Sequence, residues 1–154
     1  MITIYELMGL FDSVVQTPVT AVRVAFFAAG AGVNVLAGIP KTTTIFAQPM
    51  DPADKIDFII NCSDVLETDE SIATFTLALR PEASALGLQL GTDVYAASVL
   101  EGKRIRVWLS IDPQKQGDLA FESGAVLPFE VTINSNSVPP RRRQRTVAVK
   151  VVNT

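Results

Sequence analysis

Residues 71–79 read SIATFTLAL, a stretch without a charged side chain in which successive residues suit opposite faces of a strand. Phe75 and Leu77 fall on one face, and Thr74 and Thr76 fall on the other. Side chains alternate with this period of two in a β-strand, whereas a helix repeats every 3.6 residues. The stretch therefore predicts a β-strand with one face packed on a core.

Comparable stretches recur along the chain, with Pro, Gly and Asp turn residues between them. They cover residues 42–47, 56–62, 86–90, 93–99, 104–110, 126–133 and 146–152. Short strands at a spacing of roughly ten residues are typical of a Greek-key sandwich. We therefore predict an all-β fold, an Ig-like Greek-key β-sandwich of about seven strands. The best candidate for a helix is residues 4–15, and Pro128 is expected at a sheet edge.

Charge is unevenly distributed along the 154 residues. Residues 1–46 hold two acidic and two basic side chains, residues 47–103 ten and three, and residues 104–154 four and eight. A weakly charged segment of that length needs a surface to pack on, whether the rest of the domain, another copy or a neighbouring protein. We predict an N-terminal docking arm or extension over residues 1–46 and a sandwich domain over residues 47–154.

Residues 24–40 of this arm, VAFFAAGAGVNVLAGIP, carry no charge at all. The stretch is near the lower length limit for a membrane span, but glycines, Asn34 and Pro40 interrupt it. It also fits two short strands around a glycine-rich turn. Our prediction is that a partner protein covers it. The residues expected to contact that partner are Val24, Phe26, Phe27, Val33 and Val35.

The composition argues against most catalytic chemistry. The sequence has no histidine, which removes the commonest general base and zinc ligand, and it has one cysteine, Cys62. Cys62 is expected to be a small buried hydrophobic residue. The net charge of −3 and the pI of 4.9 disfavour nucleic-acid binding. We expect no enzyme activity, no cofactor and no small-molecule substrate.

Acidic and basic residues nevertheless gather in two regions. The acidic residues are Asp51, Asp54, Asp57, Asp64, Glu67, Asp69 and Glu70. They predict a solvated loop, with a calcium site or a glycosidase carboxylate pair as alternatives. The basic residues, which follow two prolines, are Arg141, Arg142, Arg143 and Arg145. We predict a solvated hairpin arm there, or an electrostatic contact with the acidic loop of a neighbouring copy.

Trp108 lies in the stretch RIRVWLS at residues 104–110. By alternation it shares a face with Arg104 and Arg106, which makes that face the more polar one. A tryptophan there is expected to stack on arginine or to contact a partner protein. We therefore count Trp108 with Arg141, Arg142 and Arg143 among the candidate partner-binding residues.

Three groups of residues from Asp51 onward resemble a family of small bacteriophage virion proteins. The first is Asp51, Pro52, Asp54, Asp57, Phe58, Ile60, Ser63 and Asp64. The second is DESIA at residues 69–73. The third is VWLS at residues 107–110, followed by Val131, Thr132 and the basic stretch of residues 145–151. The family has an Ig-like fold and is described as fiber–tail adaptor proteins, and the first 46 residues lie outside the resemblance.

The resemblance implies a non-enzymatic structural protein of the virion, joining fibers to the tail or neck. Its partners would then be other virion proteins of the tail, neck or capsid and further copies of itself, with no nucleic acid and no membrane. Two alternatives stay open: a capsid decoration (cement) protein and a cell-surface carbohydrate-binding adhesin module. An enzyme that uses carboxylates ranks below both.

Overall fold

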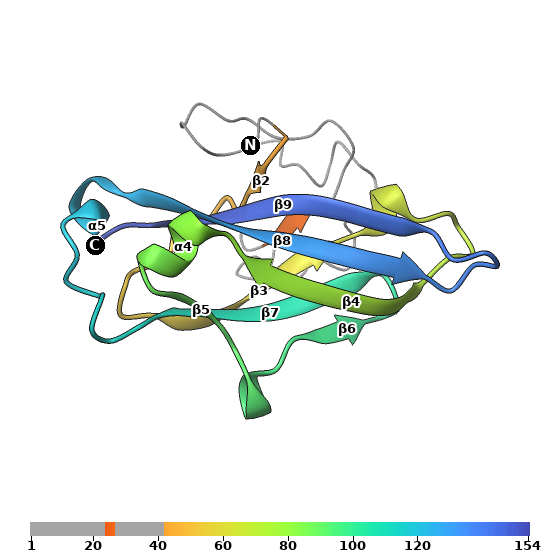
Figure 1. The fold of residues 1–154 in the computed structure, drawn as a ribbon, viewed down its shortest axis with the longest axis horizontal. Coiled ribbons are helices and arrows are strands. Elements are labelled where there is room, and N and C mark those ends of the chain that lie inside the picture. Colours follow the sequence, from red (N-terminus) through yellow and green to blue (C-terminus); the bar gives the residue numbers. More distant parts are fainter. Residues whose placement is uncertain (1–23, 27–41) are drawn as a thin grey trace.

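Two β-sheets packed face to face make up the protein in a computed structural model that describes residues 24–26 and 42–154 (Figure 1). The first sheet contains β1 (Val24–Phe26), β3 (Lys55–Asn61), β5 (Leu88–Leu90), β6 (Ser98–Leu100) and β7 (Arg104–Ile111). The second sheet contains β2 (Thr44–Ile45), β4 (Ile72–Leu79), β8 (Ala125–Ser135) and β9 (Arg142–Val151). The prediction of an all-β fold is confirmed.

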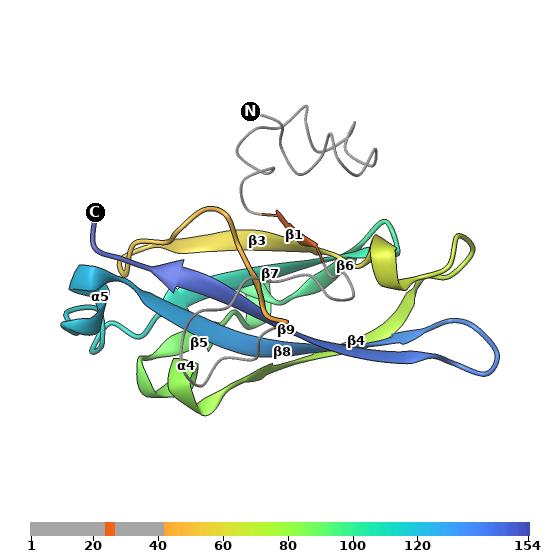
Figure 2. The ribbon, with the colours of Figure 1, turned by 90° about the horizontal axis from the view of Figure 1, so that it is seen from above.

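The strand order differs between the sheets. It is β1-β3-β7-β5 in the first sheet, with β6 also paired to β7, and β2-β9-β8-β4 in the second. The long neighbours run antiparallel, whereas β1 and β2 lie parallel to β3 and β9. The chain changes sheets at each step from β1 to β5 and again between β7 and β8, so that neither sheet is a simple meander (Figure 2).

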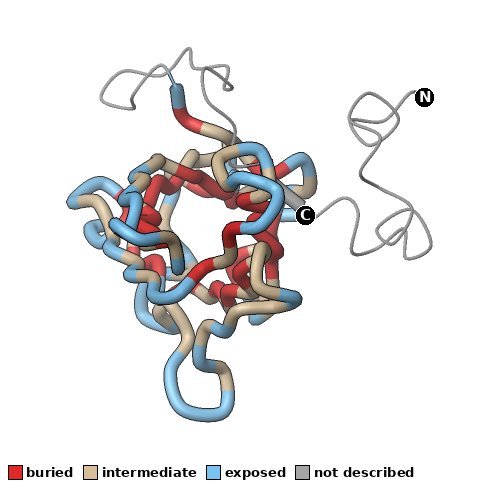
Figure 3. The backbone as a smooth tube through the Cα atoms, turned by 90° about the vertical axis from the view of Figure 1, so that its right-hand side faces the viewer, coloured by how far each residue is buried: buried red, intermediate tan, exposed pale blue. Residues whose placement is uncertain are grey.

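The core is filled by the side chains that strand alternation assigns to the inner faces. On β7, Ile105, Val107 and Leu109 are fully buried, while the residues between them remain partly exposed. Phe46 and Phe58 meet across the core with ring centroids 4.5 Å apart. Figure 3 shows buried stretches of the backbone around the centre of the molecule and exposed stretches toward its outside. Each fully buried large apolar side chain contributes roughly 1.5–3 kcal/mol relative to an exposed one.

Helices are short in the described part of the chain. They are η1 (Ser63–Val65), α4 (Pro81–Ala85), η2 (Asp93–Tyr95) and α5 (Ala120–Ser123). The longest has five residues. The helix expected at residues 4–15 lies outside the described residues.

The predicted strand at residues 93–99 is wrong in its first half. Residues 93–95 form η2, and β6 begins only at Ser98. Asp93 has a φ of 56°, a left-handed conformation that an extended strand does not accommodate. Asp and Asn adopt this conformation more readily than other non-glycine residues, which the alternation of the sequence does not reveal.

Pro128 does not lie at a sheet edge, because β8 is paired on both sides, with β9 and with β4. Its carbonyl accepts a hydrogen bond from the Arg80 amide at 3.3 Å. An amide at position 128 would point to the same side as this carbonyl, toward Arg80, where β4 ends and α4 begins. The Arg80 carbonyl already accepts a hydrogen bond from the Ala83 amide at 3.1 Å, so that the missing proline amide leaves no acceptor unpaired there. A proline is therefore tolerated inside this sheet.

The basic run lies on the hairpin formed by β8 and β9, as predicted, and its first two residues, Arg141 and Arg142, are exposed. Arg142 and Arg143 are already part of β9 and pair with Asn134 and Ile133 of β8. The connecting loop of this hairpin is residues 136–141. Long arginine stems can cover a sheet face while the guanidinium groups stay in water, which lets a run of charges continue a strand.

The sandwich begins before residue 47. The β2 strand pairs with β9, the Phe46 amide donates to the Ala148 carbonyl at 2.9 Å, and Phe46 is 2% exposed. Further upstream, β1 pairs in parallel with β3 of the same chain, with Val24 opposite Ile59. The described part of the predicted arm thus adds a strand to its own sheet.

Candidate functional site

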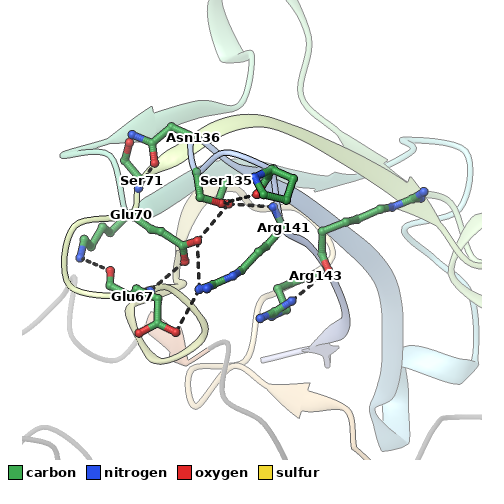
Figure 4. Close-up of polar contacts among 11 residues, drawn as sticks. Glu67, Glu70, Ser71, Ser135, Asn136, Arg141 and Arg143 are labelled. Atoms are coloured by element: carbon green, nitrogen blue, oxygen red, sulfur yellow. Dashed lines mark hydrogen bonds and ion pairs between the residues drawn. The ribbon is translucent and has the colours of Figure 1, made fainter.

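A network of acidic, hydroxyl and basic side chains joins the β8–β9 hairpin to the loop that precedes β4 (Figure 4). We call it the hairpin network; it comprises Glu67, Glu70, Ser135, Ser137 and Arg141. Arg141 Nη1 lies 3.0 Å from Glu67 Oε1 and 3.3 Å from Glu70 Oε1. Ser135 Oγ donates to Glu70 Oε1 at 3.2 Å and accepts from the Arg141 amide at 3.0 Å. Ser137 Oγ lies 2.7 Å from Ser135 Oγ.

Main-chain contacts strengthen the same junction. The Ser71 amide donates to Asn136 Oδ1 at 2.9 Å, and the Asn136 amide donates back to the Ser71 carbonyl at 3.0 Å. The Ser135 amide donates to the Arg141 carbonyl at 2.9 Å, which closes the hairpin loop. The loop and the hairpin are therefore held together at several points.

Glu70 is the centre of this network, with a side chain only 5% exposed. The Glu67 amide donates to Glu70 Oε2 at 2.9 Å, and this bond is the main reason why the pKa of Glu70 lies below its ordinary value of 4.5. Burial opposes the shift, while the hydroxyls and the Arg141 charge reinforce it. The carboxylate form of Glu70 is thus stabilised chiefly by the Glu67 amide of its own loop, and further by Ser135, Ser137 and Arg141 of the hairpin.

The pairing of acidic and basic regions is found within one chain for Arg141. Its ion pairs are with Glu67 and Glu70 of the same chain. A contact between the basic run and the acidic loop of a neighbouring copy stays a prediction. A hairpin turn brings residues 67 and 141 together although 74 positions separate them. Alternation alone does not reveal such a contact, because it depends on how the two loops meet.

The tip of the hairpin is exposed. Val138 is 98% exposed, more than any other large hydrophobic side chain of the described residues. Arg142 and Arg143 follow the tip on opposite faces of β9, and Arg143 Nη1 donates to the Arg142 carbonyl at 3.4 Å. The network thus fixes the base of a projecting loop that carries the exposed Val138 and leads into two cationic residues at the start of β9.

A second candidate surface lies on the outer face of the first sheet. We call it the aromatic patch; it comprises Trp108, Tyr95 and Lys55. The Trp108 and Tyr95 rings meet edge to face with centroids 5.1 Å apart, and Lys55 Nζ lies 4.0 Å from the Tyr95 ring centroid. Beside the patch, Arg106 Nε lies 3.4 Å from Asp57 Oδ2. The prediction that Trp108 shares the polar face of β7 is confirmed.

Gly91 allows the loop that carries Tyr95 to pack on Trp108. The Gly91 amide donates to the Trp108 carbonyl at 2.9 Å. A Cβ at this position would lie 2.3 Å from the Tyr95 carbonyl oxygen and 2.8 Å from Trp108 Cβ. Sequence reasoning did not include Tyr95 or Lys55 in the patch. The one signal in the sequence is a glycine four residues before Tyr95, and it is a weak one.

A shallow depression of about 460 Å³ adjoins the aromatic patch. It is lined by Lys55, Leu79, Leu88, Gln89, Leu90, Gly91, Thr92 and Ser110. Apolar stems and neutral polar groups thus share one hollow next to two aromatic rings. Such a surface is suited to binding through stacking and hydrogen bonds.

The remaining predicted partner-binding residues belong to the N-terminal region. Val24 and Phe26 are in β1, whose backbone pairs with β3. Phe27, Val33 and Val35 lie outside the described residues. Their contact with a partner remains a prediction.

The acidic residues do not form one cluster. Asp51 accepts bonds from the Ala53 amide and from the amide and hydroxyl of Thr154, which lower its pKa. Burial raises the pKa of Asp64. In residues 42–154 and 24–26, no three His, Cys, Asp or Glu side chains lie close enough together to hold a metal ion. The calcium alternative therefore has no support in this part of the chain.

Cys62 is fully buried, as predicted, and desolvation raises its pKa to about 12. None of the helices in the described ranges has the length and apolar character needed to cross a membrane. Comparison of the chain with known protein families and with curated proteins finds no match.

Proposed function

We propose that this protein is a non-enzymatic structural component of a bacteriophage virion, an Ig-like adaptor that joins fibers to the tail or neck. The order of the long strands supports the Ig-like part of this proposal. In Ig domains the second and fifth strands are neighbours in one sheet, and the third, sixth and seventh form the other. Here β3 and β7 are neighbours in the first sheet, and β4, β8 and β9 lie side by side in the second.

The residues that carry the family resemblance lie in the turns and strands of this framework. Asp51 and Pro52 precede β3, and residues 69–73 lead into β4. Residues 107–110 lie in β7, and residues 145–151 lie in β9. The resemblance therefore bears on the same strands whose order supports an Ig-like sandwich, and this agreement favours the family's role.

The observation that carries the proposal is the braced hairpin. The buried carboxylate of Glu70 and the hydroxyl of Ser135 fix its base, while Val138 projects almost fully exposed at its tip. A rigid scaffold that presents an exposed apolar side chain among cations is suited to contact another protein. Such an arrangement supports a binding role within a larger assembly, with other virion proteins and further copies of the chain as partners.

Cross-linking mass spectrometry of purified phage particles tests this proposal. We expect links from the hairpin tip or the N-terminal region to a fiber, tail or neck protein. Links to the major capsid protein alone would instead favour the capsid decoration role. Absence of the chain from purified particles would refute both.

The aromatic patch favours a second candidate, a carbohydrate-binding adhesin module. Trp108 and Tyr95 lie on an outer sheet face beside a depression that contains Gln89 and Ser110. Sugars are commonly bound by aromatic rings with neighbouring hydrogen-bonding groups. A glycan array with the wild type and Trp108→Ala discriminates: saturable binding that the substitution abolishes supports the adhesin, and a blank array excludes it.

A further inference from the structure

The β4 strand leaves one side of the second sheet open. It ends the order β2-β9-β8-β4, and among the described strands only β8 pairs with it. Figure 2 shows β4 along one margin of the sandwich. At eight residues it is much longer than the other edge strands, β1, β2, β5 and β6, which have two or three residues each.

The direction of the free hydrogen-bonding groups on β4 follows from its contacts. The Arg80 amide donates to the Pro128 carbonyl on the β8 side. Because successive amides of a strand alternate in direction, the amides of Thr76 and Ala78 also face β8. Those of Phe75 and Leu77 then face the open edge. At the start of the strand the Ile72 amide already donates to the Gly102 carbonyl at 2.7 Å, so that the free part of the edge runs from Thr74 to Leu79.

Natural proteins usually protect such an edge with charges, prolines or a covering element. The β4 strand, IATFTLAL, has no charged residue and no proline. Its one irregularity is a register shift between Ile72 and Thr74, which leaves the strand from Thr74 to Leu79 regular. The outward side chains of Thr74, Thr76 and Ala78 are exposed and small. This edge is open to pairing rather than guarded against it.

We infer that β4 pairs with β4 of a second copy of this chain, antiparallel about a two-fold axis at Thr76. Two uncharged strands meet without repulsion, although each chain carries a net charge of −3. A strand that offers only main-chain groups and small side chains is complementary to itself, as an isologous contact requires. In this register Thr76 lies opposite Thr76, and Phe75 lies opposite Leu77, so that aromatic and aliphatic side chains pair across the junction.

This inference rests on the proposed assembly role, because the β4 pairing is one contact within the assembly. The experiments can nevertheless refute the β4 contact and the assembly role separately. A monomeric chain that is nevertheless found in particles overturns the β4 contact alone. A dimeric chain that is absent from particles overturns the assembly role alone.

Disulfide trapping of the full chain tests the register. Thr76 would face its counterpart in a non-hydrogen-bonded pair, with Cα atoms about 4.5 Å apart, which suits a disulfide. Cys62 is buried, so that the introduced thiol is the reactive one. We expect Thr76→Cys to form a covalent dimer on mild oxidation, while the control Ser98→Cys, an exposed residue on edge strand β6, stays monomeric. Equal cross-linking of the two variants would overturn the inference.

Analytical ultracentrifugation provides a second readout that needs no cysteine. The wild type should show a concentration-dependent dimer. Thr76→Lys places two like charges opposite each other and should raise the dissociation constant several-fold, up to about fivefold. Ser98→Lys should leave the dissociation constant unchanged. A wild type that is monomeric at every concentration, or equal behaviour of the two lysine variants, would contradict the β4 contact.

Discussion

At the scale of single residues, the buried hydroxyl of Ser135 connects several groups of the hairpin network. It is 2% exposed and contacts Glu70, Ser137 and the Arg141 amide. Ser135→Ala removes a buried group and leaves its partners unsatisfied, so that we expect a loss of about 1–2 kcal/mol in the free energy of unfolding. Urea denaturation measures this free energy of unfolding. Ser84→Ala, an exposed position in α4, serves as the control and should change stability by less than about 0.5 kcal/mol.

The lowered pKa of Glu70 predicts a dependence of stability on pH. A carboxyl group whose pKa is lower in the folded than in the unfolded state stabilises the fold above its ordinary pKa, here 4.5. That contribution disappears as the pH falls through the lowered folded value. Glu70→Gln should therefore be less stable than wild type at neutral pH, and the difference should shrink in acid. Urea denaturation at a series of pH values measures the free energy of unfolding of both proteins. A difference between them that stayed constant from neutral to acid pH would contradict this prediction.

Cys62 offers a simple probe of burial. Its thiol is fully buried with a pKa raised to about 12, and the thiolate is the reactive form. We expect no reaction with a thiol reagent in the native protein at neutral pH and rapid reaction in urea. Rapid labelling of the native protein would show that the inner face of β3 opens to solvent.

At the scale of elements, alternation in the sequence predicted most strands because each has one face on the core. It missed the turn at Asp93, which depends on a left-handed φ that alternation does not reveal, and the position of Pro128, which depends on where β4 ends. It also missed the hairpin network and the aromatic patch. Glu67 and Arg141, or Tyr95 and Trp108, meet only after the loops are placed, and no period in the sequence records that.

The loop between β5 and β6 depends on the close approach at Gly91. Gly91→Ala places a Cβ against the Tyr95 carbonyl and Trp108, and we expect a loss of roughly 1–3 kcal/mol from this overpacking. Gly117→Ala is the matched control, because a Cβ there meets nothing within 4 Å. Thermal unfolding measures the stability of both variants, and tryptophan fluorescence reports on the packing around Trp108. Equal stability of both variants would show that the loop does not pack on Trp108 as described.

At the scale of the whole molecule, the sandwich accounts for the described part of the chain, and the N-terminal region is where the assembly hypothesis remains to be tested. The core includes Phe46 and the strands from β2 onward. A chain that lacks residues 1–40 retains all of these and loses β1. We expect it to unfold cooperatively, because the two sheets keep every long strand.

The most direct test of the proposed function is the copy number of this chain in purified particles, measured by quantitative mass spectrometry. Phages are assembled with either the full chain or the chain that lacks residues 1–40. We predict several copies per particle of the full chain and none of the shortened one, although the latter is folded. Incorporation of the shortened chain at the normal copy number would contradict the docking role of residues 1–46, and absence of the full chain would contradict the virion role itself.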